Sequence, residues 1–250
     1  SRPSAGLWAI KRVTRAYFGG AADRPVPGDY KGDGVWDEGI FRPSSGLWAI
    51  RGISRIYFGG SSDPVIPGDY NGDGTSDVGI FRNSAGLWAI RGVTGFYYGR
   101  SDDTPITGDF NGDGTTDAGV YRSSAGLWAV RDHTKFYYGP PGDIPVHGDY
   151  DGTGMDIPAL FRGASGLWAV RGKTRFYFGN LSDQPVPADY NGDGLCDYGV
   201  FRNSSGLWSV RSVTRKYFGG SGDFPQPFNP GSGGSDRICI FRPPLGLWAV

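Results

Sequence analysis

Residues 61–100 read SSDPVIPGDYNGDGTSDVGIFRNSAGLWAIRGVTGFYYGR, and this pattern returns along the whole chain with a period of 40 residues. The tripeptide Gly-Leu-Trp ends at Trp8, Trp48, Trp88, Trp128, Trp168, Trp208 and Trp248. Each repeat contains four short apolar runs between turns rich in Gly, Asp and Asn, and no window shows apolar residues at helical spacing. A 40-residue unit of four strands is the size of one β-propeller blade.

The two ends of the chain complete the count of blades. Residues 1–20 supply the third and fourth strands of a unit, residues 21–220 supply five whole units, and residues 221–250 supply three more strands. We therefore predict one all-β domain: a closed β-propeller of six four-stranded blades, with a composite closing blade from 1–20 and 221–250. The third strand is present twice in that blade, in 1–10 and 241–250, and the copy that is used stays open. Seven blades with incomplete terminal blades are the alternative.

The composition of the 250-residue chain excludes several classes of function. Lys plus Arg number 25 and Asp plus Glu number 25, so the formal net charge is zero. A neutral chain is a poor match for nucleic acid or for an anionic membrane surface. No apolar run is long enough to span a membrane. Of the 25 acids 24 are Asp, a residue typical of turns and metal loops rather than of helices.

Each repeat carries an acidic loop between its first two strands. In residues 69–77 oxygen-bearing side chains occupy loop positions 1, 3, 5 and 9, and Gly fills positions 4 and 6. Ca²⁺ takes roughly six to eight oxygen ligands, and the carbonyl at position 7 adds one more. Glycine permits the left-handed backbone that such a loop needs. Without an ion the carboxylates repel one another, so the metal would also stabilise the fold.

We predict three or four Ca²⁺ ions in these loops. The ligands of the three complete copies are Asp69, Asn71, Asp73, Thr75 and Asp77; Asp109, Asn111, Asp113, Thr115 and Asp117; and Asp189, Asn191, Asp193, Leu195 and Asp197. The ligands of the fourth ion are Asp29, Asp33, Val35 and Asp37. In that first loop Lys31 stands at position 3 and must swing outward for an ion to bind.

The remaining copies depart from the pattern. In 149–157 position 9 is lost and Asp156 lies one residue early, so this loop is not counted as a site. The copy at 229–237 has lost nearly every ligand, and we expect no ion there. For all copies the alternative is a hairpin closed by Asx turns without metal.

The motif Asp-x-Asn/Asp-x-Asp-Gly-x-x-Asp followed by Gly-Ile-Phe-Arg resembles the calcium loops of FG-GAP/VCBS-type repeats. These repeats occur in integrin α-subunit propellers and in many secreted bacterial proteins. The resemblance covers essentially the whole chain in five or six copies, and the 40-residue unit is closer to bacterial forms and to calcium-bearing propeller lectins than to integrins. It implies a β-propeller with calcium in its hairpin loops, located outside the cytoplasm as a secreted or cell-surface protein. Adhesion modules and lectins are the functions that it implies.

Aromatic and basic residues also recur at fixed places in each repeat. Aromatic faces bind the apolar side of a pyranose ring, while Arg, Asp and Asn hydrogen-bond its hydroxyls. We therefore predict a lectin-like module with several equivalent sites for glycans or glycoproteins, whose binding gains from avidity. The candidate residues are Trp48, Trp88, Trp128, Arg82, Arg91, Tyr57, Tyr97 and Tyr137. The alternative is structural, with Trp packed between blades and Arg paired with a neighbouring Asp.

No catalytic constellation is recognisable. An active site normally breaks repeat symmetry, and the unique His133, His147 and Glu38 have no nucleophile or second catalytic group at a known spacing. We predict no enzyme activity. Cys196 and Cys239 fall in neighbouring repeats, so a disulfide and two separate thiols are both open. Oligomer formation is open as well, and the alternative function is that of a protein-binding, adhesion or structural domain of a larger surface protein.

Overall fold

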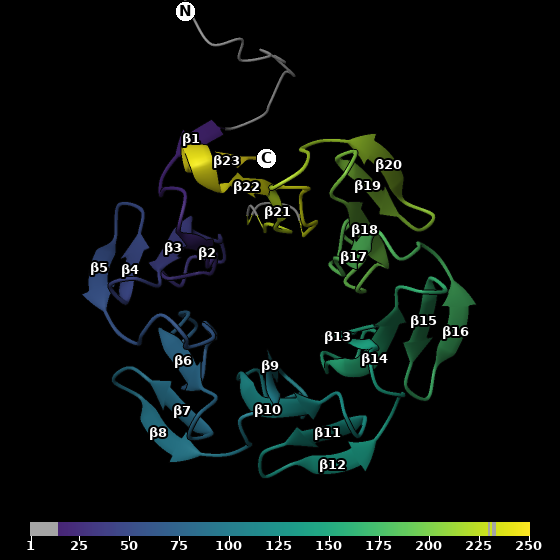
Figure 1. Ribbon diagram of the computed structural model, residues 1–250, viewed down its shortest axis with the longest axis horizontal. Helices are drawn as coiled ribbons and strands as arrows, with labels where there is room; N and C mark the ends of the chain where they lie inside the picture. The colour runs from purple at the N-terminus through teal and green to yellow at the C-terminus, as the bar shows by residue number, and fades with distance from the viewer. Residues whose placement is uncertain (1–14, 230, 232–233) are drawn as a thin grey trace, which may run out of the picture.

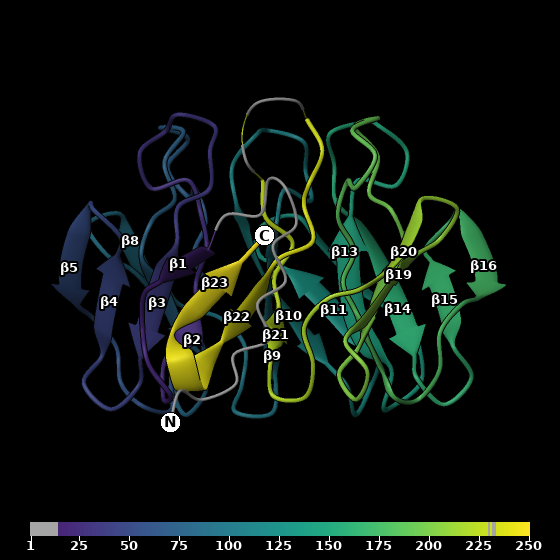
Figure 2. The same cartoon turned by 90° about the horizontal axis from the view of Figure 1, so that it is seen from above.

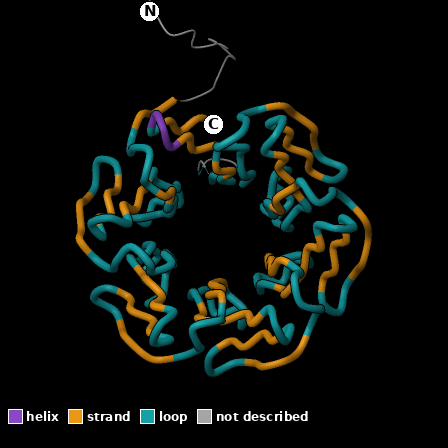
Figure 3. Tube along the Cα trace, in the orientation of Figure 1, coloured by secondary structure: helices purple, strands orange, loops and turns teal. Residues whose placement is uncertain are grey.

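The computed structural model describes residues 15–229, 231 and 234–250, which form six antiparallel sheets arranged radially about a central axis (Figure 1, Figure 3). The predicted six-bladed propeller is confirmed, and the seven-bladed alternative is wrong. Apart from a 3-10 turn at Pro243–Leu245, the described part of the chain contains no helix. The described residues therefore contain no helix that is long and apolar enough to cross a bilayer.

The first five blades follow one another along the chain, with their first strands nearest the axis and their fourth strands at the rim (Figure 1). Blade 1 contains β2 (Arg24–Pro25), β3 (Gly39–Arg42), β4 (Leu47–Ile50) and β5 (Ser54–Tyr57). Blade 2 contains β6 (Gly79–Arg82), β7 (Leu87–Ile90) and β8 (Thr94–Tyr97). Its innermost strand is reduced to two isolated bridges, between Val65 and Ile80 and between Gly68 and Asp77.

Blades 3 to 5 repeat the same order of strands. Blade 3 contains β9 (Thr104–Gly108), β10 (Asp117–Arg122), β11 (Leu127–Val130) and β12 (Thr134–Tyr137). Blade 4 contains β13 (Ile144–Gly148), β14 (Ile157–Arg162), β15 (Leu167–Val170) and β16 (Thr174–Tyr177). Blade 5 contains β17 (Asp183–Pro185), β18 (Gly199–Arg202), β19 (Leu207–Val210) and β20 (Thr214–Tyr217).

Blade 6 joins the two ends of the described chain. Its strands are β21 (Phe224–Pro225), β22 (Ile240–Arg242), β23 (Leu247–Ala249) and, at the rim, β1 (Arg15–Tyr17). Tyr17 lies opposite Leu247, the Leu–Tyr register that the other blades have between strands 3 and 4. Trp248 Nε1 donates to the Phe18 carbonyl at 3.1 Å. The C-terminal copy of the third strand therefore sits in this sheet, while the copy in residues 1–10 lies outside the described residues.

Both recurring motifs begin with glycine because the backbone passes close to another segment. A Cβ on Gly79, at the start of Gly-Ile-Phe-Arg, would lie 2.6 Å from the Ile66 carbonyl oxygen. Gly86, at the start of Gly-Leu-Trp, has φ +64°, and a Cβ there would lie 2.6 Å from the Gly99 carbonyl oxygen. A larger residue at either place would push strand 1 or the blade junction away.

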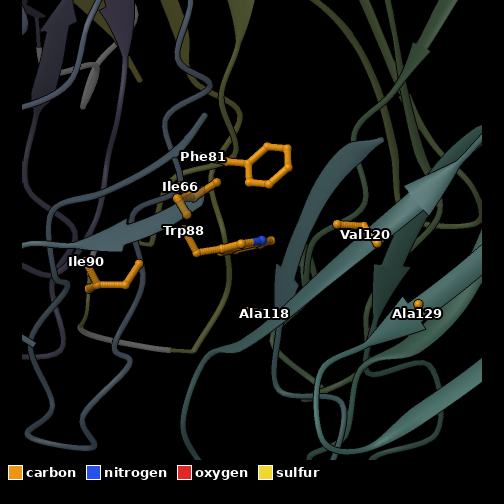
Figure 4. Close-up of a cluster of buried hydrophobic side chains, with 7 residues drawn as sticks. All are labelled: Ile66, Phe81, Trp88, Ile90, Ala118, Val120 and Ala129. Atoms are coloured by element: carbon orange, nitrogen blue, oxygen red, sulfur yellow. The ribbon is translucent and has the colours of Figure 1, made fainter. Parts of the chain in front are cut away.

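The apolar core lies between neighbouring blades. Figure 4 shows Phe81 and Trp88 of blade 2 beside Ala118 and Val120 of blade 3. The Trp88 ring is tilted against Phe81 at 5.2 Å, and its Nε1 donates to the Tyr98 carbonyl at 3.0 Å, so the one polar atom of the indole is satisfied. Each blade therefore depends on its neighbour to bury its largest side chains.

A hydrogen bond also joins each acidic loop to the loop of the next blade, around the whole ring. The carbonyl of Asp69, loop position 1, accepts from the Thr116 N–H, loop position 8, at 2.6 Å. The last bond, from Trp36 N–H to the Asn229 carbonyl at 3.0 Å, runs from blade 1 back to blade 6. The other donor and acceptor pairs are Ser76 and Asp29, Asp156 and Asp109, Cys196 and Asp149, and Asp236 and Asp189.

Candidate functional site

An ion pair fixes the arginine that ends strand 2 of every blade. Arg82 donates through Nε and Nη2 to the two carboxylate oxygens of Asp63, at 3.3 and 3.0 Å. Asp63 is 2% exposed and also accepts from the Gly60 N–H at 3.0 Å. The hydrogen bond to Asp63 raises the pKa of Arg82, so a permanent cation is held in one orientation. The equivalent pairs are Asp23–Arg42, Asp103–Arg122, Asp143–Arg162, Asp183–Arg202 and Asp223–Arg242.

An exposed tyrosine accompanies this arginine. Arg82, Leu87 and Tyr97 lie in one row across β6, β7 and β8, and residues in register point to the same face of a sheet. Tyr97 is 74% exposed, and its phenol contributes electrostatically to the raised pKa of Arg82. The pair with Asp63 leaves Nη1 of Arg82 unused. The structure thus brings the predicted Arg82 and Tyr97 together in solvent, and Tyr57 and Tyr137 occupy the same place in blades 1 and 3.

The tryptophans lie in a different environment. Trp48, Trp88 and Trp128 are 0% exposed. In blade 3 the Trp128 indole stacks on Phe136 at 6.2 Å, and the guanidinium of Arg171 from blade 4 lies 3.8 Å from the centre of the Phe136 ring. The faces of these indoles are therefore used in packing between blades, and the tyrosine is the solvent-facing aromatic residue of each repeat.

Arg91 is separated from the group formed by Arg82 and Tyr97. It follows strand 3 directly, next to the pair of Ile90 and Thr94, whereas Tyr97 pairs with the first residue of that strand. Arg91 is exposed, and its backbone N–H donates to the Val78 carbonyl at 2.9 Å. The equivalent arginines Arg131, Arg171 and Arg211 each lie over a phenylalanine ring of the preceding blade.

The acidic loops rise together on one face of the propeller, as Figure 2 shows. In loop 69–77 the Asp69 carboxylate accepts from the N–H groups of Gly72 and Gly74 at 2.7 and 2.8 Å. Asp77 Oδ2 accepts from the Tyr70 N–H at 3.0 Å. These are the bonds of an Asx-type turn, and they order the loop without any ion.

The free oxygens at positions 5 and 9 converge on one nitrogen atom. Asn111 Nδ2 donates to Asp113 Oδ2 at 3.0 Å and to Asp117 Oδ1 at 3.1 Å. In the first loop the Lys31 ammonium takes this place and contacts Asp37 Oδ1. At position 7 the backbone N–H groups of Val35, Thr75, Thr115 and Leu195 donate to the carboxylate at position 5.

In the complete loops the carboxylate at position 9 has a raised pKa, because it is partly buried and faces other carboxylates. Burial, together with the charges of Asp73 and Asp69, raises the pKa of Asp77. The same causes raise the pKa of Asp117 and Asp197. A divalent cation among these oxygens would relieve the repulsion, so the all-oxygen donor set fits Ca²⁺ once the amide at position 3 turns its oxygen inward. Among the described residues no three acidic, His or Cys side chains already converge as a metal site, so calcium stays a prediction.

The fourth loop uses different chemistry. Asp156 is at position 8, facing the neighbouring blade, and its Oδ2 lies 3.0 Å from His147 Nδ1. Lys173 Nζ pairs with Asp151 Oδ2 at 2.6 Å, and the hydrogen bond from Lys173 lowers the pKa of Asp151 to about 2. The chain itself thus supplies side-chain partners for two acids of this loop, and its exclusion from the calcium sites stays a prediction.

The other unique residues also have identifiable surroundings. Both cysteines are free thiols, and burial raises the pKa of Cys196 and, to about 12, that of Cys239, so both stay protonated. Glu38 pairs with Arg51 at 3.3 Å. In the sixth loop, where no ion was predicted, residues 230 and 232–233 lie outside the described residues.

Comparison with known proteins supports the propeller fold but identifies no family. No protein-family description and no curated protein matches the sequence. Among solved structures, the chain is similar to a lectin from Agrocybe aegerita that recognises non-reducing terminal N-acetylglucosamine, with a TM-score of 0.57 and 14% identity over 88% of this chain and 75% of the lectin. It is also similar to streptogramin B lyase, with a TM-score of 0.54 and 10% identity over 95% and 86% of the two chains.

These likenesses show the propeller fold alone. One of the two neighbours binds a sugar and the other is named as an enzyme, so the fold does not choose between binding and catalysis. The assignment to FG-GAP/VCBS-type repeats stays a prediction from the motifs.

Proposed function

We propose that the chain is a secreted, calcium-binding propeller that binds carbohydrate without catalysing a reaction, through equivalent sites at its rim. The observation that carries the proposal is the repetition, blade after blade, of an exposed tyrosine beside an arginine held by a buried aspartate, as in Tyr97, Arg82 and Asp63. The sugar-recognising lectin among the structural neighbours, also a propeller, supports it.

The geometry of this group suits a pyranose ring. The Tyr97 ring offers an apolar face to solvent, and Arg82 Nη1 is positioned to donate to a hydroxyl. Asp63 fixes the guanidinium before the ligand arrives, which reduces the entropy lost on binding. Exposed groups of this kind bind weakly one at a time, and several sites on one ligand would raise avidity by a factor of ~100 or more.

Repetition also favours binding over catalysis. The same side chains recur in each blade, whereas two of the acid and base residues that break the repeat are paired with other side chains. His147 is paired with Asp156, and Glu38 is paired with Arg51. Calcium would act structurally in this proposal, because the acidic loops lie at the opposite end of the blades from Tyr97. Bound there, it would neutralise the carboxylates at positions 1, 5 and 9.

A glycan array probed with the labelled protein in calcium tests the proposal. The matched variants are the triple substitutions Tyr57→Ala, Tyr97→Ala, Tyr137→Ala and, as control, Tyr→Phe at the same three positions. We expect the alanine variant to lose about 10-fold or more in apparent affinity and the phenylalanine variant to keep most of it, since the ring supplies the apolar face. Absence of binding to every glycan at about 100 μM protein would exclude even weak recognition and refute the proposal.

A further inference from the structure

The outermost strands of the blades alternate a basic residue with the exposed tyrosine. On β5, Arg55 and Tyr57 are exposed while Ile56 between them is half-buried. Because strand residues two apart point to the same side at roughly 7 Å, the cation and the phenol are neighbours on the rim. The basic residues at this position are Arg15, Arg55, Lys135, Arg175 and Arg215, and blade 2 has Gly95 instead. We name these residues and the six tyrosines the rim belt.

A second cation, the arginine that ends strand 2, lies in the same row of the sheet as each tyrosine. Arg42, Leu47 and Tyr57 lie in one row across β3, β4 and β5. The Arg42 side chain is 43% exposed beside its partner Asp23, and Tyr57 contributes to its raised pKa. In blade 1 the phenol is thus flanked by Arg55 along the strand and by Arg42 across the sheet.

Protection of sheet edges does not account for this pattern. Charged side chains on edge strands, lysine in particular, discourage pairing with other chains, yet four of the five basic residues at this position are arginine. Here every charged residue at the alternating position is basic, in a chain of zero net charge with 24 aspartates. The rim tyrosines are 67–74% exposed in all six blades and add nothing to such protection. An exposed aromatic residue on an unpaired edge strand would instead favour aggregation.

We propose that the rim belt binds an acidic polysaccharide, a polymer of uronic-acid type that carries carboxylates on pyranose rings. This inference rests on the proposed carbohydrate binding and names its ligand class. The tyrosine ring supports the face of the sugar, while residues such as Arg55 and Arg42 pair with its carboxylate. Charge complementarity selects the acidic polymer, and the circular arrangement lets one polymer contact several blades (Figure 1). Blade 2, with Gly95, holds the weakest of the six contacts.

The test compares two polymers with the same sugar backbone: polygalacturonate, which carries free carboxylates, and its fully methyl-esterified form, which carries none. The loss variant combines Arg55→Gln, Lys135→Gln, Arg175→Gln and Arg215→Gln. The gain variant is Gly95→Arg, where a Cβ would have no atom nearer than 3.8 Å. The control is Arg24→Gln, which removes an exposed charge from the innermost strand of blade 1.

We expect binding of polygalacturonate about 10-fold tighter than of the ester at about 50 mM NaCl, with most of the difference lost at about 500 mM. The loss variant should abolish the preference, the gain variant should strengthen binding of polygalacturonate, and the control should change nothing. Melting curves of all variants exclude misfolding as the cause.

The alternative outcomes separate this inference from the function that it rests on. Equal binding of the two polymers, or binding of neutral glycans on the array without any binding of polygalacturonate, overturns the acidic ligand and leaves carbohydrate binding in place. No binding of any sugar overturns both. Binding of single-stranded poly(dT) as tightly as polygalacturonate shows unselective attraction of polyanions and also overturns the inference.

Discussion

In the three blades with complete acidic loops, blades 2, 3 and 5, the two ends hold aspartate in opposite electrostatic settings. At one end, in blade 3, Asp103 is buried and faces Arg122 at 2.7 Å. At the other end, Asp117 faces Asp113 and Asp109, whose charges add to the effect of burial and raise its pKa. The comparison teaches that the chain supplies a cation to aspartate at one end, whereas at the other end it supplies none to the complete loops, where we propose that Ca²⁺ binds.

The irregular loops support this interpretation. Lys31 contacts Asp37 in the first loop, and Lys173 pairs with Asp151 in the fourth, and both loops depart from the full ligand pattern. The complete loops, such as 109–117, form no ion pair with Lys or Arg among the described residues. A lysine of the chain thus occurs where the oxygen set is incomplete, and it supplies the positive charge that we propose Ca²⁺ supplies in the complete loops.

Removal of the internal cation at the paired end should have the largest effect. Arg122→Ala leaves the fully buried Asp103 carboxylate without its partner, and we expect the free energy of unfolding to fall by about 3 kcal/mol. Urea denaturation measures this. Arg131→Ala, at an exposed position, is the control and should cost less than about 1 kcal/mol. A loss as small as the control's would show that the pair contributes little.

Addition of the external cation at the loop end comes next. If the three complete loops bind Ca²⁺ with the affinity of extracellular modules, about 1 mM calcium should stabilise the fold by about 2 kcal/mol in all. The melting temperature should then rise by about 4–8 °C over that in chelator. Substitution of Asn for Asp77, Asp117 and Asp197 together should remove this rise. An unchanged melting temperature in the unsubstituted protein would mean that the loops are metal-free Asx turns.

A pH titration sharpens the comparison at Asp236, where no arginine is paired with the acid. Burial raises the pKa of Asp236 to about 6, above the value near 3.8 of the unfolded chain. With respect to this group, the folded protein is therefore most stable below pH 3.8, where Asp236 is protonated in both states, and it loses this stability as pH rises through about 6. Asp236→Asn should therefore stabilise the fold at pH 8 by about 1–2 kcal/mol and have little effect at pH 4. The control Asp132→Asn, at a 79% exposed side chain, should change the free energy of unfolding by less than about 0.5 kcal/mol. Equal effects of Asp236→Asn at the two pH values would contradict the assignment.

The smallest effect is expected from exchanging the two kinds of cation in one loop. Lys31→Asn removes the ammonium from Asp37 and completes the oxygen pattern at positions 1, 3, 5 and 9. Isothermal titration calorimetry should find one additional Ca²⁺ per chain, and without calcium the variant should melt slightly lower than the parent. An unchanged number of ions would show that lysine is not what keeps the ion out.

The sequence predicted the blade count because an unbroken 40-residue period leaves little freedom in how four strands recur. It gave the pairing of Arg with a neighbouring Asp only as an alternative and did not name Asp63 as the partner of Arg82, although the constant spacing of 19 residues in every blade was an available signal. The basic residues of the rim belt were missed for another reason: their position holds Arg55 in blade 1, Gly95 in blade 2 and Lys135 in blade 3, so no single residue type recurs there.

Asp156 shows that residue types alone do not determine which side chains of a loop point inward. From sequence it resembled a calcium ligand displaced by one residue. Its place is set instead by the backbone bond from its N–H to the Asp109 carbonyl of the preceding loop, at 2.6 Å. That bond puts its carboxylate near His147 rather than inside its own loop. A contact between blades cannot be read from the spacing within one blade.

The pairing of β1 with β23 has a consequence for how the molecule assembles. Within a blade, Trp88 bonds to a carbonyl 10 residues away, but Trp248 reaches Phe18 across 230 residues. If that contact formed first in a flexible chain, the longer loop would cost roughly 3 kcal/mol more in closure entropy. Local hairpins should therefore form early, and the ring should be sealed in a late, slow step that renders the finished propeller kinetically persistent.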